Sequence, residues 1–259
     1  MKMTMNLQNE LNALKKASLH FNLVQTEKDI TPKLDTYFGG KPFITNTQEI
    51  HDCPICKKNM QFIFQLIMPI KNSSTKKLYA FYYCFECVQD NYEGAYAVNI
   101  YSNPTEDKMV KELDYISRVP YCDVEFLPAY DIPEWHYCKD SSPEFINKLE
   151  TMYGTKAYET YEQMEKRVQE YAVDTGNKIK GYPSYMEYSD IPRCPHTQQP
   201  MEPLVQMESI PELNLSWLGK DSYLILFKSP LYDEFELRTV NFSDYEEEIM
   251  GDDEAILDY

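Results

Sequence analysis

The chain has 259 residues, of which 43% are hydrophobic, and a formal net charge of −17. This length suffices for one large domain or two lobes, and the composition permits a sizeable core. No apolar run approaches the roughly 20 residues of a membrane-spanning helix, and Glu10, Lys15 and Lys16 interrupt the apolar pattern near the N-terminus. We therefore expect no membrane span and no signal peptide, and a cytoplasmic protein whose thiols stay reduced.

The charge is unevenly distributed along the chain. Residues 1–130 hold 14 Lys and Arg against 15 Asp and Glu, whereas residues 131–259 hold 11 against 27. So acidic a half opposes broad nucleic-acid binding, which needs a basic surface, and predicts a basic protein partner. Residues 244–259 contain eight acids and no base, which is typical of a solubilising tail or, alternatively, of a docking tail. One local group of lysines forms either a local basic patch for nucleic acid or, in the interpretation we favour, the solvated rim of a metal site: Lys57, Lys58, Lys71, Lys76 and Lys77.

The first half of the chain is predicted to hold one opening helix and then a small antiparallel sheet. Residues 5–22 repeat apolar side chains at helical spacing. The segments 60–68, 78–83 and 95–101 are rich in aromatic and β-branched residues, as expected for strands. The stripe of the opening helix comprises Leu7, Leu11, Leu14, Ser18 and Phe21.

The middle of the chain is predicted to be mainly helical. Asn103-Pro104 resembles a helix start, and Met109, Leu113 and Ile116 would continue its apolar face. Residues 119–138 are rich in proline and aromatic residues and are predicted to be irregular or an edge strand. Ser142-Pro143 opens a helix that Gly154 ends, and Thr155 caps a longer one. The stripe of this longer helix comprises Tyr158, Tyr161, Met164, Val168 and Ala172.

Four cysteines form the most specific motif. Cys53-Pro54-Ile55-Cys56 and Cys84-Phe85-Glu86-Cys87 are two C-x-x-C pairs with 27 residues between them. Two such pairs at this separation are typical of a tetrahedral zinc site in which each pair presents two thiolates. Four thiolates leave no open coordination position, so the predicted zinc is structural and no catalytic residue is assigned. The alternative is a set of redox-active or disulfide-bonded cysteines.

The second half of the chain repeats features of the first at an offset of 141 residues, which predicts an internal duplication. With three further residues inserted, the alignment continues to Lys76 with Lys220 and Tyr79 with Tyr223. The matched pairs before that insertion are Gly40/Gly181, Pro42/Pro183, Ile50/Ile191, Cys53/Cys194, Pro54/Pro195, Met60/Met201 and Gln65/Gln206.

The second copy is predicted to lack metal. The positions aligned with Cys56, Cys84 and Cys87 are Thr197, Lys228 and Leu231, so Cys194 and His196 are left without further ligands. We interpret Cys194 as a relic and expect the segment 222–227 and Trp217 to replace the metal by packing.

Together these patterns predict an α+β fold with two related β-rich lobes, zinc knuckles in the first lobe only, and helices at the N-terminus and between the lobes. The expected boundaries are 1–130 for the first lobe, 131–175 for a helical connector, 176–243 for the second lobe, and 244–259 for the acidic tail.

The residues resemble a known superfamily. Gly39-Gly40-Lys41-Pro42, the four cysteines and the Gln65 strand resemble the N-terminal part of the programmed cell death protein 2 family and its ribosome-assembly relatives. The second half resembles the bacterial YwqG-like domain of unknown function, through 178–183, the Gln206 strand and 216–227. This sequence departs from the pattern at Lys180, where a second glycine is usual, and in the interrupted Trp-Gly-Asp stretch at 217–221.

The resemblance covers roughly residues 35–242 and implies an α+β fold with duplicated β-rich halves. For function it implies a chaperone that holds a ribosomal protein before assembly, an RNA-processing role, or an immunity protein that neutralises a toxin. We therefore expect a non-enzymatic module that binds a basic protein.

Two alternatives remain. An enzyme would have to use His136 with Asp131 and Glu134, or Asp190 with His196, but neither set forms a recognised catalytic motif. RNA binding would use some of the 22 tyrosines for base stacking, against the net charge. The sequence leaves the oligomeric state open.

Overall fold

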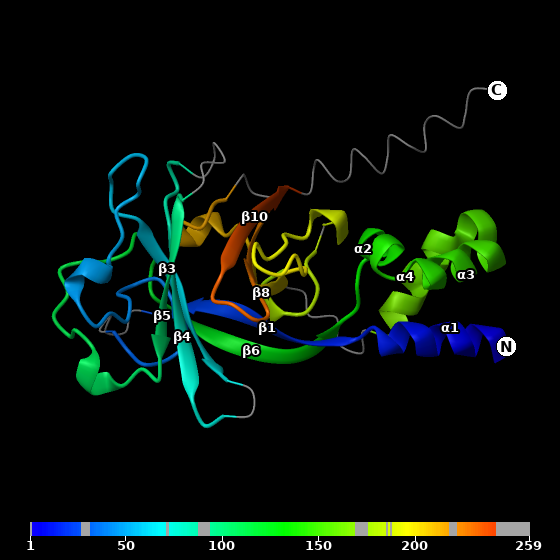
Figure 1. Ribbon diagram of the computed structural model, residues 1–259, viewed down its shortest axis with the longest axis horizontal. Helices are drawn as coiled ribbons and strands as arrows, with labels where there is room; N and C mark the ends of the chain where they lie inside the picture. Colours follow the sequence, from blue (N-terminus) through cyan, green and yellow to red (C-terminus); the bar gives the residue numbers. More distant parts are fainter. Residues whose placement is uncertain are drawn as a thin grey trace. The chain divides into compact units, whose positions relative to one another are not determined.

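The computed structural model describes residues 2–26, 32–70, 73–87, 94–168, 176–184, 186, 188–217 and 222–241. Within them the protein is mixed α and β, with more strands than α-helices (Figure 1). The expected tail 244–259, the end of the connector at 169–175 and residues 218–221 lie outside the described part. No helix in the described residues is long and apolar enough to cross a membrane.

The chain divides into two compact units. One consists of 1–21, 126–208 and 221–259, and we call it the helix-bearing unit. The other consists of 22–125 and 209–220, and we call it the cysteine unit. This division differs from the four consecutive segments expected from the sequence, because the opening helix belongs with the helices that follow residue 131.

Within the described residues, the helix-bearing unit contains four α-helices, which are α1 (Lys2–Ala13), α2 (Trp135–Ser141), α3 (Pro143–Tyr153) and α4 (Ala157–Val168). These helices lie close together (Figure 1). They enclose an apolar core that includes the fully buried Leu11, Leu149 and Tyr161. Helix α3 begins with proline at its N-terminus and ends at Gly154, whose φ of +55° suits glycine, so both predicted signals are confirmed.

The strands of this unit lie in the order β10-β9-β8-β7-β1 and pair antiparallel. They are β1 (Lys16–Gln25), β7 (Lys178–Lys180), β8 (Glu202–Glu208), β9 (Ser222–Lys228) and β10 (Phe235–Asn241). Strands β8 and β9 are buried along most of their length, which agrees with their near-continuous apolar sequence.

The cysteine unit has the strand order β6-β2-β3-β4-β5, again antiparallel where register is defined. The strands are β2 (Tyr37–Phe38), β3 (Gln61–Pro69), β4 (Lys76–Tyr83), β5 (Tyr96–Ser102) and β6 (Cys122–Asp131), and both β1 and β6 contribute residues to each unit. The three strands predicted for residues 60–101 are confirmed. Their buried rings, among them Phe62, Phe64 and Phe81, supply an aromatic core.

The prediction of one helix over residues 5–22 is wrong in its second half. Helix α1 ends at Ala13 and buries Leu7 and Leu11 as expected, but β1 begins at Lys16. The β1 sequence alternates apolar and polar residues through Leu19, Phe21 and Leu23, which is the period of a strand. Pairing with β7 satisfies the backbone there, so the strand period prevails over the helical spacing.

The helix predicted from Asn103 is also wrong. Only a 3₁₀ turn, Glu106–Lys108, forms, and the Ile116 side chain is 59% exposed. The chain beyond it runs beside β3, where the Ser117 hydroxyl donates to the Phe62 carbonyl. Of the two alternatives predicted for residues 119–138, a strand forms, β6, although it has a neighbouring strand on each side and is no edge strand, and α2 begins at Trp135.

Candidate metal centre

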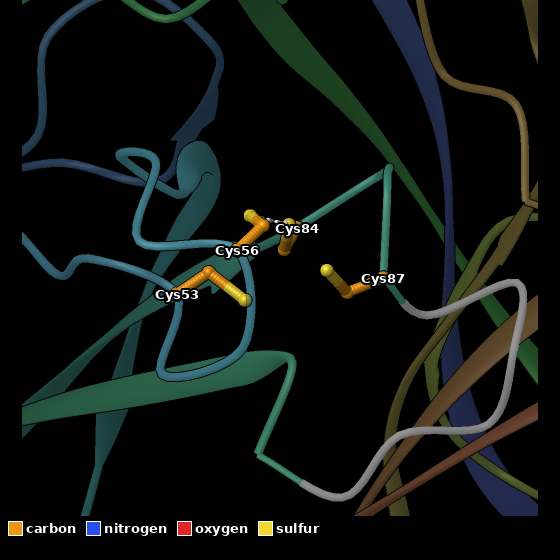
Figure 2. Close-up of side chains that lie close together, drawn as sticks. All are labelled: Cys53, Cys56, Cys84 and Cys87. Atoms are coloured by element: carbon orange, nitrogen blue, oxygen red, sulfur yellow. Dashed lines mark hydrogen bonds between the residues drawn. The ribbon is translucent and has the colours of Figure 1, made fainter.

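The four cysteines of the C-x-x-C pairs converge in the cysteine unit (Figure 2). Their sulfur atoms all lie within 4.8 Å of one another, and Cys56 Sγ is 3.6 Å from Cys84 Sγ. Tetrahedral zinc with Zn–S bonds of about 2.3 Å places sulfurs roughly 3.8 Å apart, so the cluster has the right size for a metal ion. Three of the four side chains are buried, and Cys56 is half-buried. The four thiols therefore can hold a metal ion.

The first pair is shaped by a tight turn. The Cys53 N–H donates to the Lys58 carbonyl at 2.8 Å, and the Lys57 N–H donates to the Cys53 carbonyl at 2.9 Å. Lys57 adopts a left-handed backbone with φ +60°, which closes the turn. The backbone N–H groups of Ile55 and Cys56 point at the Cys53 sulfur. Such N–H···S bonds orient a thiolate ligand from outside the coordination sphere.

The second pair follows directly from β4. The Cys84 N–H donates to the Ala95 carbonyl at 2.8 Å, and the Cys87 N–H donates to the Cys84 carbonyl at 3.2 Å. Lys58 and Glu86 form an exposed ion pair that joins the two knuckles. The sulfurs are thus presented by two rigid turns.

An aromatic stack supports the second knuckle. The Phe85 ring lies parallel to the Trp217 indole, with centroids 5.7 Å apart, and the Arg118 guanidinium lies 3.8 Å from the Phe85 centroid. Trp217 belongs to the cysteine unit. The expectation that Trp217 replaces the metal in the second half is therefore wrong, because the segment 209–220 carries it to the knuckle of the first.

Ionisation of all four cysteine thiols requires a cation that neutralises the negative charges of the thiolates. Burial and the neighbouring thiols raise the pKa of Cys87 to about 12, and burial raises the pKa of Cys84. Burial opposes ionisation of Cys53 too, but the N–H groups of Cys56 and Ile55 outweigh it and lower the pKa of Cys53 to about 7. Four adjacent thiolates repel one another, and a bound metal cation reverses this penalty.

The helix-bearing unit contains a turn with the same backbone geometry around Cys194. The Cys194 N–H donates to the Gln199 carbonyl at 2.9 Å, and the Gln198 N–H donates to the Cys194 carbonyl at 2.8 Å. Gln198 has φ +58°, close to the value at Lys57. Short antiparallel bridges follow in both units, Asp52 with Asn59 and Arg193 with Pro200.

The hairpins that follow these turns also agree in detail. Both contain a register shift, between Phe62 and Phe64 in β3 and between Pro203 and Val205 in β8. Lys180 has φ +62°, the value found at Gly39, so the departure from glycine keeps the left-handed backbone. In the first hairpin Gln65 pairs with Ala80, and in the second Gln206 pairs with Ile225. The second strands of the hairpins, β4 and β9, are therefore related by an offset of 145 residues, not by the 144 of the sequence alignment.

This offset changes which residues after β9 correspond to the cysteines of the second knuckle. Ser229 and Tyr232, not Lys228 and Leu231, stand at the hairpin positions of Cys84 and Cys87. Burial disfavours the Cys194 thiolate, but the hydroxyls of Ser229 and Thr197 and two backbone N–H groups stabilise it and lower the pKa of Cys194 to about 7. Hydroxyl groups thus surround this cysteine. The sequence pointed to Thr197 but missed Ser229, because the connection between β8 and β9 is one residue longer than the alignment allowed.

Two of the residues considered for an enzyme, Asp131 and His196, take part in other contacts. Asp131 accepts hydrogen bonds from Ser18 Oγ at 2.8 Å and from the Tyr182 N–H at 3.2 Å, and it pairs with His20 and Lys178. These partners hold the pKa of Asp131 far below its usual range although burial raises it. His196 Nε2 lies 3.2 Å from Glu234 and its ring packs on Tyr232.

Known proteins give no further guidance on this site. A scan of protein-family models finds none that matches the chain, and a sequence search of curated proteins finds no match.

Proposed function

We propose that Cys53, Cys56, Cys84 and Cys87 bind one structural zinc ion. Thiolates are preferred zinc ligands, and the compact all-sulfur set fits a closed tetrahedral site. Zinc bound there would neutralise the clustered thiolates and tie the first turn to the end of β4, without a coordination position for substrate.

We also infer that the two β-rich lobes arose by internal duplication. The support is the repetition of turns, bridges, register shifts and left-handed residues at one constant offset of 141 up to the first hairpin strand. On this view the first copy kept its metal ligands, while the second replaced them with a cysteine and hydroxyl groups.

For the whole protein we propose a non-enzymatic module that binds a basic protein, as a chaperone or an inhibitor. The observation that carries the proposal is charge: the helix-bearing unit holds 13 Lys and Arg against 27 Asp and Glu, and the cysteine unit holds 12 against 15. A field this one-sided steers cationic surfaces towards the protein and repels nucleic acid. The resemblance to the programmed cell death protein 2 and YwqG-like groups agrees with this role.

The acidic character also acts locally in the described residues. Burial and the neighbouring carboxylates of Glu134 and Glu162 raise the pKa of Glu165 to about 7. A cation that approaches such crowded acidic groups stabilises them, because it reduces their mutual repulsion.

The alternative functions are RNA binding and an enzyme of unrecognised class.

The test is affinity purification at low salt followed by association kinetics with the recovered partner. One matched variant converts the eight acids of 244–259 to Asn or Gln, which keeps the tail length. We expect a basic protein whose association slows as salt rises from about 50 to 500 mM, over which the Debye length shrinks about threefold. The neutral-tail variant should associate more slowly. RNA in the eluate, or a partner without net positive charge, would contradict the proposal, and equal rates for both tails would remove the tail from it.

A further inference from the structure

Strand β5 lies at one end of the strand order, because β4 is its only neighbour among the described strands. Its sequence contains no charged residue and no proline, the two devices that usually protect a free edge from pairing with another strand. At the other end of the order, β10 carries the ion pair of Glu236 with Arg238 and directly follows Asp233 and Glu234. Of these two edges, β5 is therefore the one suited to accept a further strand.

Alternate residues of β5 direct their backbone groups away from β4. The Cys84 N–H donates to the Ala95 carbonyl, and the register is unbroken from there, so the odd-numbered residues of β5 form the hydrogen-bonded pairs with β4. The N–H and carbonyl groups of Val98 and Ile100 consequently point outward. Within the described ranges, no backbone hydrogen bond reaches the outward groups of these two residues.

Both faces of β5 contact the cysteine unit itself, which leaves the edge as the part that a partner can reach. On one face, the Asn99 amide donates to the Glu49 carbonyl, and the Tyr101 hydroxyl donates to the Glu49 carboxylate. On the other face, the centroid of the Tyr96 ring lies 6.2 Å from that of the Phe81 ring. The strand is nevertheless partly exposed along its whole length, as expected when one long edge is open.

The sequence of β5 is self-complementary about Asn99. Two antiparallel copies related by a two-fold axis at Asn99 place Val98 of one copy opposite Ile100 of the other. These are outward residues, so each such pair exchanges two backbone hydrogen bonds, and their β-branched side chains suit a strand. On the opposite face Tyr101 meets the small Ala97, which leaves room for the ring.

Charge also favours a second copy as the occupant of this edge. The cysteine unit holds 12 Lys and Arg against 15 Asp and Glu, so two copies that meet through it repel each other only weakly. The helix-bearing unit, with 13 against 27, is poorly suited to self-association. A basic external partner would gain no ion pair from the uncharged side chains of β5.

We propose that the protein self-associates through β5, whose outward edge pairs antiparallel with β5 of a second copy about a two-fold axis at Asn99. Pairing satisfies the outward N–H and carbonyl groups of both edges. A strand pair of seven residues buries less surface than a standard interface, so the dimer should dissociate at micromolar concentrations. The inference goes beyond the proposed function and does not depend on an external partner.

The test is sedimentation velocity of the purified full-length chain from micromolar to millimolar concentration, together with amide hydrogen exchange followed by NMR. The native chain should pass from monomer to dimer as its concentration rises. The amides of Val98 and Ile100 should exchange more slowly at high concentration only. The Asn99 amide, which is bonded to β4, should be protected at every concentration.

Proline substitutions at the two edges provide a matched pair. Val98→Pro removes an outward N–H and leaves the ladder with β4 intact. Because the dimer loses this donor twice, the Kd of self-association should rise by about tenfold or more. Thr239→Pro is the control, since the Ser229 N–H to Glu234 carbonyl bond makes residue 239 an outward position of β10, and it should leave the Kd unchanged.

Two double variants test the register. Val98→Lys with Ile100→Lys brings like charges face to face and should keep the chain monomeric, whereas Val98→Lys with Ile100→Glu brings opposite charges together and should retain the dimer. Both variants place ionised side chains at the same two positions, so an effect on folding is shared. Equal association of the two would contradict the register.

Three further results would overturn the proposal. The first is a native chain that stays monomeric at millimolar concentration. The second is equal protection of the Val98 and Ile100 amides at every concentration, which would show that the chain covers its own edge. The third is a dimer that Thr239→Pro abolishes and Val98→Pro does not, which would assign the interface to β10.

Discussion

Gln65 and Gln206 make the same hydrogen bonds to the same relative positions of the chain. Each side-chain oxygen accepts the N–H of the residue 22 positions earlier, Phe43 at 2.8 Å and Ser184 at 2.9 Å. Each side-chain nitrogen donates to the carbonyl of the residue 30 positions earlier, Asp35 at 2.7 Å and Gly176 at 3.0 Å. Each buried glutamine thus closes a loop of about 30 residues onto a strand.

The first prediction is that Gln65→Leu and Gln206→Leu each lower the free energy of unfolding by about 2–5 kcal/mol. Leucine is close in size but leaves a buried N–H and carbonyls without partners, and each orphan group costs about 1–3 kcal/mol. Urea unfolding followed by tryptophan fluorescence separates the units, because Trp217 lies in the cysteine unit and Trp135 in the helix-bearing unit. Gln163→Leu, exposed on α4, is the control, and equal stability of all three variants would refute the prediction.

The second prediction concerns the metal. Cys84→Ser should reduce bound zinc from one ion per chain to none and destabilise the cysteine unit by several kcal/mol, given about 10–16 kcal/mol for structural zinc in finger peptides. Cys194→Ser should leave the zinc content at one. Elemental analysis of anaerobically purified protein decides the stoichiometry, and Trp217 fluorescence reports the loss of order beside Phe85. Two ions per chain, or none, would disprove the assignment.

The cysteine cluster was predictable from the sequence because ligand spacing is a local property. The pairs Cys53/Cys56 and Cys84/Cys87 each form within one turn, and the hairpin of β3 and β4 brings the two turns together. The helices around Pro143 and Gly154 were predictable for the same reason, since their ends are marked by residues with restricted or permissive backbones.

The errors occur where tertiary contacts override local patterns. Residues 16–25 form a strand because β7 pairs with them, although Ser18 and Phe21 continue a helical spacing. Residues 109–116 fail to form a helix because Tyr115 and Ser117 satisfy the edge of β3. The partners of Asp131 come from segments more than 45 residues away, so no local motif could reveal them.

The third prediction concerns this buried carboxylate. Asp131→Asn should lower the free energy of unfolding by about 3–5 kcal/mol at neutral pH, because Lys178 and His20 lose their buried partner. The folded pKa of Asp131 lies below its unfolded value, so its contribution is present above about pH 4 and fades as pH falls further. The difference in stability between the variant and the native chain should therefore narrow progressively as pH falls below about 4. Asp140→Asn, exposed on α2, should show no such convergence because it should differ little at any pH.

The fourth prediction concerns Glu165, whose pKa is shifted in the opposite direction to that of Asp131. The pKa of Glu165 is raised to about 7, so the folded state binds its proton more tightly than the unfolded state. Stability should fall as pH rises from about 4.5 to 7, by at most roughly 3 kcal/mol and less after solvent screening. Glu165→Gln should remove this fall and make the protein more stable than the native chain at pH 8. Glu150→Gln, exposed on α3, controls for the loss of one negative charge, and an equal gain there would contradict the local explanation.

The last prediction concerns Cys194, whose thiolate accepts hydrogen bonds from Ser229, Thr197 and two backbone N–H groups. Ser229→Ala and Thr197→Val should each raise the pKa of Cys194 from about 7, because each removes a donor to the charged form while burial still opposes ionisation. The ¹³Cβ shift of Cys194, followed by NMR as a function of pH, measures this directly. The native pKa lies below the unfolded value of about 8.5, so the stability that these donors contribute is present above that pH and lost as pH falls to about 7. Unfolding at pH 9 should therefore separate the variants from the native chain more than unfolding at pH 6. Thr155→Val, exposed beyond the end of α3, serves as the control, and an unchanged Cys194 titration in both variants would show that the hydroxyl groups do not hold the thiolate.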